Sequence, residues 1–123
     1  MICIRLSNFG QPYFLYMTVN ELNSLTARNR LVLVDFYASW CGPCNAMSSV
    51  IDSIERQFGN TIDVLRVDVD QYESVGLVHH YRVMSVPTIM IFRRGRMLWR
   101  NSGMVTLDTL ADVIRRFDRV EVY

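Results

Sequence analysis

The stretch Trp40-Cys41-Gly42-Pro43-Cys44 decides both the fold and the chemistry that we expect of this chain. Its two cysteines stand three positions apart, a spacing at which they can close a small disulfide ring. The preceding apolar run, residues 31–37 (Leu-Val-Leu-Val-Asp-Phe-Tyr), predicts a strand that is buried on both faces of a sheet. Apolar residues then recur every three or four positions as far as Phe58, which predicts a helix over about 43–58. The sequence therefore predicts a redox-active cysteine pair where a strand turns into a helix.

The first cysteine, Cys41, is expected at the N-terminus of this helix and facing solvent, while Cys44 faces inward. Pro43 suits the first helical turn because its fixed φ is already helical, and Gly42 lets the turn tighten. The helix dipole favours a thiolate at this end by roughly 1 to 2 kcal/mol, or about one pKa unit. Cys41 is therefore the predicted nucleophile. Because one pKa unit changes the reaction rate only slightly, we also expect a groove that positions the partner disulfide.

A pair of cysteines at this spacing could instead be half of a zinc site, which needs two further cysteine or histidine ligands. The chain offers few candidates: Cys3 stands alone, and His79 and His80 are adjacent on a predicted helix, so they point in different directions. We therefore expect no metal and no cofactor.

Length and composition predict one domain. The chain has 123 residues, of which 50% are hydrophobic, enough for a single core. The formal net charge of +1 gives no reason to expect nucleic acid or anionic lipid as a partner. No uninterrupted apolar run approaches the ~18 residues that a membrane helix requires, so we expect no membrane partner.

Residues 1–13 are expected to form an N-terminal extension beyond what the fold needs, with the domain over 14–123. The extension lacks the pattern of a signal peptide, because Arg5 is its only cation and polar residues interrupt its apolar ones. A cytoplasmic location is therefore expected. Cys3 is expected to be a free thiol in this flexible segment.

Strands and helices alternate along the chain, so the predicted fold class is α/β with strands of mixed direction. Thr18 and Glu21 form a capping box at the start of a helix, and Thr106 caps the last one. The expected strands cover about 14–16, 31–37, 62–69, 88–92 and 97–100, the last two forming a hairpin around Arg93-Arg94-Gly95, and the expected helices cover about 18–28, 43–58, 73–81 and 106–117.

Asp35 is an acid in the middle of an apolar strand, so it must be hydrogen-bonded, paired or protonated. Burial should raise its pKa. Such perturbed acids often mark functional sites, although Asp35 could also be a structural acid that pairs with a neighbouring cation.

Taken together, these residues resemble the thioredoxin family. The resemblance covers about residues 14–117, with the strand 32–37, the motif Trp40 to Cys44, Val86-Pro87-Thr88, the turn at 93–95 and Gly103 in matching order and spacing. It implies a thioredoxin fold, a central mixed β-sheet of about five strands flanked by about four helices. It also implies a monomeric enzyme whose dithiol reduces disulfides in other proteins and is usually reduced in turn by a flavoprotein thioredoxin reductase.

The same resemblance implies roles for individual residues. Cys41 and Cys44 are the catalytic pair within the motif Trp40, Gly42 and Pro43, and Asp35 relays a proton to or from Cys44. Arg66 stands where the family usually has lysine near this aspartate, and we expect it to hold Asp35 ionised more firmly.

A substrate groove is also implied by the resemblance. It would be formed by Trp40, a cis Val86-Pro87 peptide, Gly103 and Met104, and the backbone of Val86 would pair with an extended substrate.

Two other functions stay open at this point. A disulfide isomerase or oxidase of a secretory compartment would use the same cysteine pair, although the Gly-Pro dipeptide accompanies reducing members of the resembled superfamily. A non-enzymatic scaffold would not need the cysteines at all.

Overall fold

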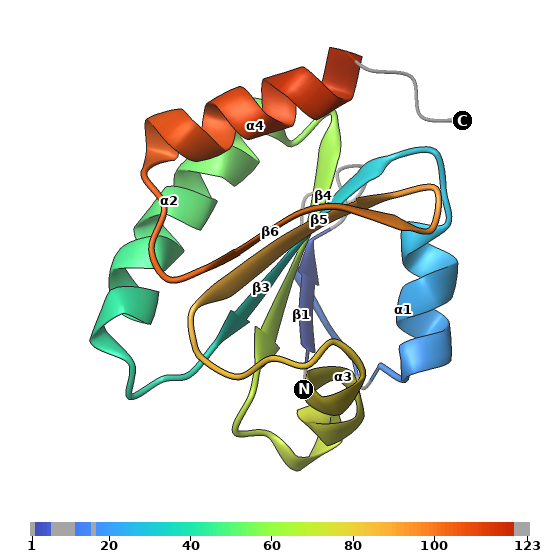
Figure 1. Ribbon diagram of the computed structural model, residues 1–123, viewed down its shortest axis with the longest axis vertical. Coiled ribbons are helices and arrows are strands. Elements are labelled where there is room, and N and C mark those ends of the chain that lie inside the picture. Colours follow the sequence, from blue (N-terminus) through green and yellow to red (C-terminus); the bar gives the residue numbers. More distant parts are fainter. Residues whose placement is uncertain (1, 6–11, 16, 120–123) are drawn as a thin grey trace.

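The computed structural model of the chain describes residues 2–5, 12–15 and 17–119. Within these residues six strands form one sheet in the order β2-β1-β4-β3-β5-β6 (Figure 1). Strands β3 and β4 are parallel and the other neighbours are antiparallel, which confirms the predicted mixed α/β fold. The strands are β1 (Ile2–Arg5), β2 (Pro12–Leu15), β3 (Leu31–Tyr37), β4 (Ile62–Asp68), β5 (Thr88–Arg93) and β6 (Arg96–Ser102).

The first and the last helix begin where the sequence places their caps. At the start of α1 the Thr18 hydroxyl accepts from the N–H of Glu21, whose carboxylate accepts from the N–H of Thr18. Thr106 caps α4 in a similar way, since its hydroxyl accepts from the N–H of Thr109. The helices are α1 (Val19–Thr26), α2 (Gly42–Phe58), α3 (Val75–His80) and α4 (Leu107–Arg119), with a short 3₁₀ turn, η1 (Tyr72–Ser74), before α3.

Helices cover both faces of the sheet, α2 and α4 on one and α1 and α3 on the other (Figure 1). The side chains of β3 alternate between these faces, as the two-residue period of a strand requires. Leu31 and Leu33 pack with α2 and α4, whereas Val32, Val34 and Phe36 pack with α1 and α3. By this alternation Asp35 belongs to the face that α2 covers.

The N-terminal strand differs from the sequence prediction. Residues 2–5, expected in an extension outside the fold, form β1, which pairs antiparallel with β4 on one side and with β2 on the other. A run of four residues carries too little periodicity to predict a strand, and β1 is ordered by the edge of β4 that it covers. Residues 6–11, Tyr16 and the side chain of Cys3 lie outside the described part of the chain.

The β5–β6 hairpin turns at Arg94 and Gly95, whose φ values of 52° and 75° match the left-handed conformation of a two-residue hairpin turn. Both residues donate backbone hydrogen bonds at the end of α1, Gly95 to the carbonyl of Thr26, the last residue of the helix, and Arg94 to that of Arg28 just after it. The hairpin tip is thereby tied to the N-terminal end of β3, at the end of the sheet opposite the cysteine motif.

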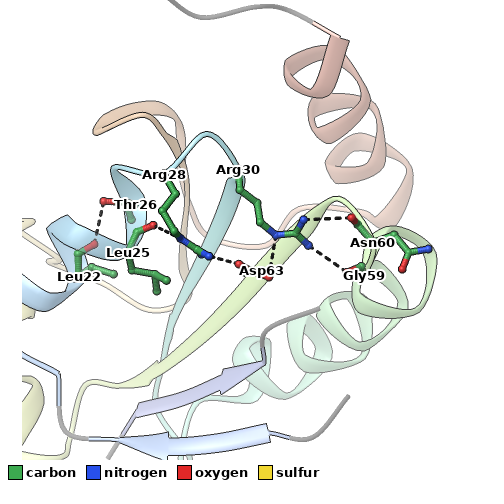
Figure 2. Close-up of polar contacts among 8 residues, drawn as sticks. All are labelled: Leu22, Leu25, Thr26, Arg28, Arg30, Gly59, Asn60 and Asp63. Atoms are coloured by element: carbon green, nitrogen blue, oxygen red, sulfur yellow. Dashed lines mark hydrogen bonds and ion pairs between the residues drawn. The ribbon is translucent and has the colours of Figure 1, made fainter. Parts of the chain in front are cut away.

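A buried carboxylate holds this end of the sheet together. Asp63 of β4 is 2% exposed and pairs with Arg28 at 2.6 Å and with Arg30 at 3.0 Å (Figure 2). Each arginine also donates to carbonyls at the C-terminus of a helix: Arg28 to Leu25 of α1, and Arg30 to the carbonyls of residues 59 and 60 after α2. Asp63 therefore links β4 to the ends of two helices.

Among the described helices, none is both long and apolar enough to span a lipid bilayer.

Candidate active site

The cysteine pair lies at the start of α2, where the chain leaves β3, as predicted, and its two sulfurs are joined in a disulfide. Cys41 is the N-cap of α2, and its Sγ accepts a hydrogen bond of 3.1 Å from the backbone N–H of Cys44. Pro43 occupies the first turn, where no acidic side chain opposes the helix dipole. Once the disulfide is reduced, the N–H groups and the dipole of α2 would stabilise a thiolate on Cys41.

The expectation that Cys41 faces solvent is wrong. Cys41 is 4% exposed and Cys44 is 3% exposed, so the whole disulfide is buried. Cys41 is covered because it packs with Ala38 and Val86 as well as with its partner. Attack on a substrate disulfide therefore requires the substrate to reach a recessed sulfur, which increases the importance of the surface around it.

The loop before β5 forms one side of this surface. The Val86-Pro87 peptide is cis, as predicted, and the carbonyl oxygen of Val86 lies 3.8 Å from Sγ of Cys41. Gly103 has a φ of 97° and donates its N–H to the carbonyl of Pro87 at 2.8 Å. The structure thus brings Val86, Pro87 and Gly103 together beside the reactive sulfur.

An apolar groove of about 420 Å³ begins beside the motif. Trp40 lines it and is 72% exposed, and its indole N–H donates to Asp70 at 2.7 Å, which fixes the ring. Met84 also lines it and is 90% exposed, so this methionine is a surface contact and not a core residue. Of the predicted groove residues, Trp40 and Val86 line it, whereas Pro87, Gly103 and Met104 do not. Its walls are Trp40, Val69, Val78, Val83, Met84, Ser85 and Val86.

Asp35 lies near the inner cysteine, Cys44, in a cavity separate from the groove. It is 2% exposed, and among the described residues its Oδ1 has no hydrogen-bond partner. Burial raises the pKa of Asp35 to about 7, against a smaller lowering effect from the positive charge of Arg66. A cavity of about 260 Å³, lined by Asp35 and Cys44 among others, joins this carboxyl to the inner cysteine. Asp35 is therefore placed to exchange a proton near neutral pH.

Arg66 does not hold Asp35 ionised as we expected. The two residues are neighbours in the β3–β4 register, but the guanidinium of Arg66 pairs with Asp52 at 2.6 Å and with Glu55 at 2.5 Å, both on α2. It also donates to the hydroxyl of Ser48 at 3.1 Å. Desolvation of the Asp35 carboxyl outweighs the attraction of an arginine that is engaged elsewhere.

Three groups of site residues were missed by sequence reasoning. The groove-lining valines of α3 and its flanking loops gave no signal, since they look like ordinary core residues. Asp70 is polar and could be linked to Trp40 only through the fold. A signal did exist for Ser48, Asp52 and Glu55, because spacings of four and three place them on one helix face.

In the part of the chain that the structure describes, no three histidine, cysteine, aspartate or glutamate side chains converge in a group that could hold a metal ion. The disulfide also occupies both sulfurs that a metal at the motif would need.

Comparison with known proteins identifies the family. The family model described as Thioredoxin matches residues 14–116. Thioredoxin-1 of Drosophila melanogaster is 42% identical over 77 residues, covering 63% of this chain and 70% of that protein. Thioredoxin 1 of Synechococcus elongatus is 40% identical over 83 residues, covering 68% of this chain and 76% of that protein. The chain therefore belongs to the thioredoxin family.

Solved structures agree with this assignment. The crystal structure of Deadhead, a germline-specific thioredoxin of Drosophila melanogaster, matches with a TM-score of 0.67 and 34% identity over 80% of this chain and 93% of that one. A mutant thioredoxin from Halobacterium salinarum matches with a TM-score of 0.72 and 34% identity over 84% and 88%. Family membership and the Cys41–Cys44 disulfide together identify the protein as a thiol-disulfide oxidoreductase that acts on disulfide-containing proteins.

Proposed function

We propose that this protein works as a reductant of disulfides in other proteins. The observation that carries the proposal is the placement of Cys41 at the N-terminus of α2, beside the cis Val86-Pro87 peptide and the apolar groove. A thiolate is stabilised at the helix end, and a substrate can be held next to it.

The two cysteines act one after the other in the reaction. The Cys41 thiolate attacks one sulfur of the substrate disulfide, forming a mixed disulfide and releasing the other substrate sulfur as a thiolate. Cys44 then loses its proton and attacks Sγ of Cys41, which closes the disulfide seen in the structure and releases the second substrate thiolate. Two electrons pass from the protein to its substrate.

Asp35 acts in the second step. Cys44 must lose a proton before it can attack, and the cavity between Asp35 and Cys44 provides the route for that proton. With a pKa of about 7, the Asp35 carboxyl can accept this proton near neutral pH and return it afterwards.

The groove recognises an extended substrate segment. The backbone of Val86 pairs with the segment by strand addition, while an apolar side chain next to the substrate cysteine enters the groove between Trp40 and Met84. Met104, 52% exposed, adds an adaptable contact outside the groove, next to Gly103, which lets the two chains approach closely. Recognition of this kind depends on shape and backbone, so it suits varied protein partners.

Sustained turnover needs a source of electrons. A flavoprotein thioredoxin reductase would return the Cys41–Cys44 disulfide to the dithiol, and a reducing compartment such as the cytoplasm suits this cycle. A monomer suits it as well, because substrate and reductase must reach the same sulfur in turn.

Replacing Cys44 with serine should trap substrates on the protein. With Cys44→Ser in a Cys3→Ser background, the mixed disulfide on Cys41 cannot be resolved, so protein adducts that reductant removes should accumulate on non-reducing gels. The matched control is Cys41→Ser in the same background, which keeps Cys44 and should form no adduct. If the two variants captured proteins equally, or neither captured any, the two-step mechanism would be wrong.

A further inference from the structure

Arg66 of β4 is held by α2 through three side chains. Its guanidinium pairs with Asp52 and Glu55 and donates to the hydroxyl of Ser48. The Arg66 side chain is 17% exposed and that of Glu55 is 12% exposed, so their ion pair is largely shielded from water. Such a pair is screened less by solvent than a surface pair and keeps the guanidinium in a fixed place.

This arrangement is notable because a third carboxylate, that of Asp35, lies beside the same guanidinium. Asp35 is the register partner of Arg66 on the neighbouring parallel strand, and both residues line the 260 Å³ cavity. Yet between these two described residues no ion pair or hydrogen bond forms, and Oδ1 of Asp35 has no partner among the described residues. The guanidinium is thus bound by side chains of α2 and forms no ion pair with the carboxyl on the neighbouring strand.

We propose that Asp52 and Glu55 are positioning residues that hold the guanidinium of Arg66 away from Asp35, and so keep Asp35 able to exchange a proton with Cys44. The proposal rests on the proposed function for its chemical consequence, although the geometry stands without it. It explains how a permanently charged arginine can lie beside a proton-relay carboxyl without fixing that carboxyl in its ionised form.

The direction of the effect follows from elementary electrostatics. A guanidinium that moved into contact with Asp35 would favour its charged form, and an opposite charge within about 4 to 6 Å lowers the pKa of an aspartate by about 1 to 3 units. An Asp35 with so low a pKa would be a weak base, poorly matched to the Cys44 thiol near neutral pH.

The other groups that face Asp35 do not offer the same control. On its own strand Tyr37 lines the cavity. Helix α2 contributes Cys44 to the cavity wall, while its two acids Asp52 and Glu55, which we call the clamp, pair with Arg66 and do not line the cavity. Strand β5 places Ile89 opposite Asp35 and contributes no charge there. Among the described residues around the cavity, Arg66 is therefore the positive charge that lowers the pKa of Asp35, against the larger effect of burial.

The test is to release the clamp and titrate Asp35 directly. In the double variant Asp52→Asn and Glu55→Gln the side-chain shapes are kept and both charges are lost. The carboxyl carbon of Asp35 is then followed by NMR over pH in the oxidised protein, where neither Cys41 nor Cys44 titrates and the curve belongs to Asp35 alone. We expect the pKa of Asp35 to fall by at least about one unit, since the freed guanidinium would move toward it.

A double-mutant cycle with Arg66→Gln separates two effects on the pKa of Asp35: movement of the guanidinium, and the direct electrostatic effect of the charges on Asp52 and Glu55. In that background the double variant should lower the pKa of Asp35 by less than half as much, because no guanidinium is left to move. Asp112→Asn on α4, which removes an exposed acid that pairs with Arg115 and not with Arg66, should leave the pKa of Asp35 unchanged. Equal shifts in the presence and in the absence of the Arg66→Gln substitution would overturn the proposal.

The pH profile of the second step gives the chemical readout. Release of substrate from the mixed disulfide should lose its inflection near neutral pH in the double variant and slow several-fold at pH 7. A changed Asp35 titration with an unchanged profile would overturn the claimed link to Cys44. The carboxyl titration needs no substrate. It therefore tests whether Asp52 and Glu55 hold Arg66 away from Asp35 even if the proposed reductase function itself were to fail.

Discussion

Replacing Asp35 with asparagine should make the protein more stable at pH 8 by about 2 kcal/mol and less stable at pH 4. The carboxyl has a pKa of about 7 in the folded protein, against 3.8 for the unperturbed group. The folded state therefore binds this proton more tightly than the unfolded state, so stability is lost as pH rises from about 4 through about 7. A pKa difference of about three units costs the parent about 4 kcal/mol of stability above that pH range, and Asp35→Asn removes this cost. The gain is reduced by about 1 to 2 kcal/mol, because the buried asparagine amide is left without hydrogen-bond partners.

Urea unfolding of the oxidised proteins at several pH values measures this difference. The stability of Asp35→Asn relative to the parent should change sign between pH 4 and pH 8. The same variant should also resolve the mixed disulfide more slowly than the parent does. This slowing should be larger at low pH than at high pH, where Cys44 ionises without help. A stability difference that stays constant with pH would show that Asp35 is not the titrating group.

Replacing Asp63 with alanine should lower the free energy of unfolding by about 3 kcal/mol. Its carboxylate is 2% exposed and neutralises two arginines at once, of which Arg30 is 24% exposed and Arg28 is 43% exposed (Figure 2). Removing one partner of a buried ion pair typically costs about 3 to 5 kcal/mol, because the other charge is left without compensation. The lower end is expected here, since Arg28 can turn toward water.

Asp112→Ala provides the matched control for this loss. Asp112 also pairs with an arginine, Arg115, but both side chains are more than half exposed, at 75% and 55%. Its removal should cost no more than about 0.5 kcal/mol. Equal destabilisation by the two alanine substitutions, measured by urea unfolding at one pH, would show that the burial of Asp63 does not matter.

Much of the site could be predicted from the sequence because its signals are local. The apolar run over 31–37 and the helical spacing after Trp40 place the cysteines between a strand and a helix without any knowledge of distant contacts. Asp35 is conspicuous because it interrupts an apolar run, and burial of its carboxyl raises its pKa as expected.

The features that were missed depend on contacts between distant segments. Cys41 is buried because residue 86 packs over it, and no local pattern shows that contact. Arg66 faces one carboxylate on a neighbouring strand and two on α2, and only the packed structure shows that α2 binds the guanidinium. Strand β1 is short, and it exists because β4 offers an edge to pair with.

The central claim, that Cys41 and Cys44 form a reducing couple, is tested most directly by its reduction potential. The Cys3→Ser protein is equilibrated in thiol redox buffers of defined potential, and the oxidised fraction is read from the mass shift after alkylation. We predict a single two-electron transition near about −270 mV, the value typical of thioredoxins. A potential of about −180 mV or higher would contradict this account in favour of an isomerase or oxidant, and the absence of any two-electron transition would leave a scaffold.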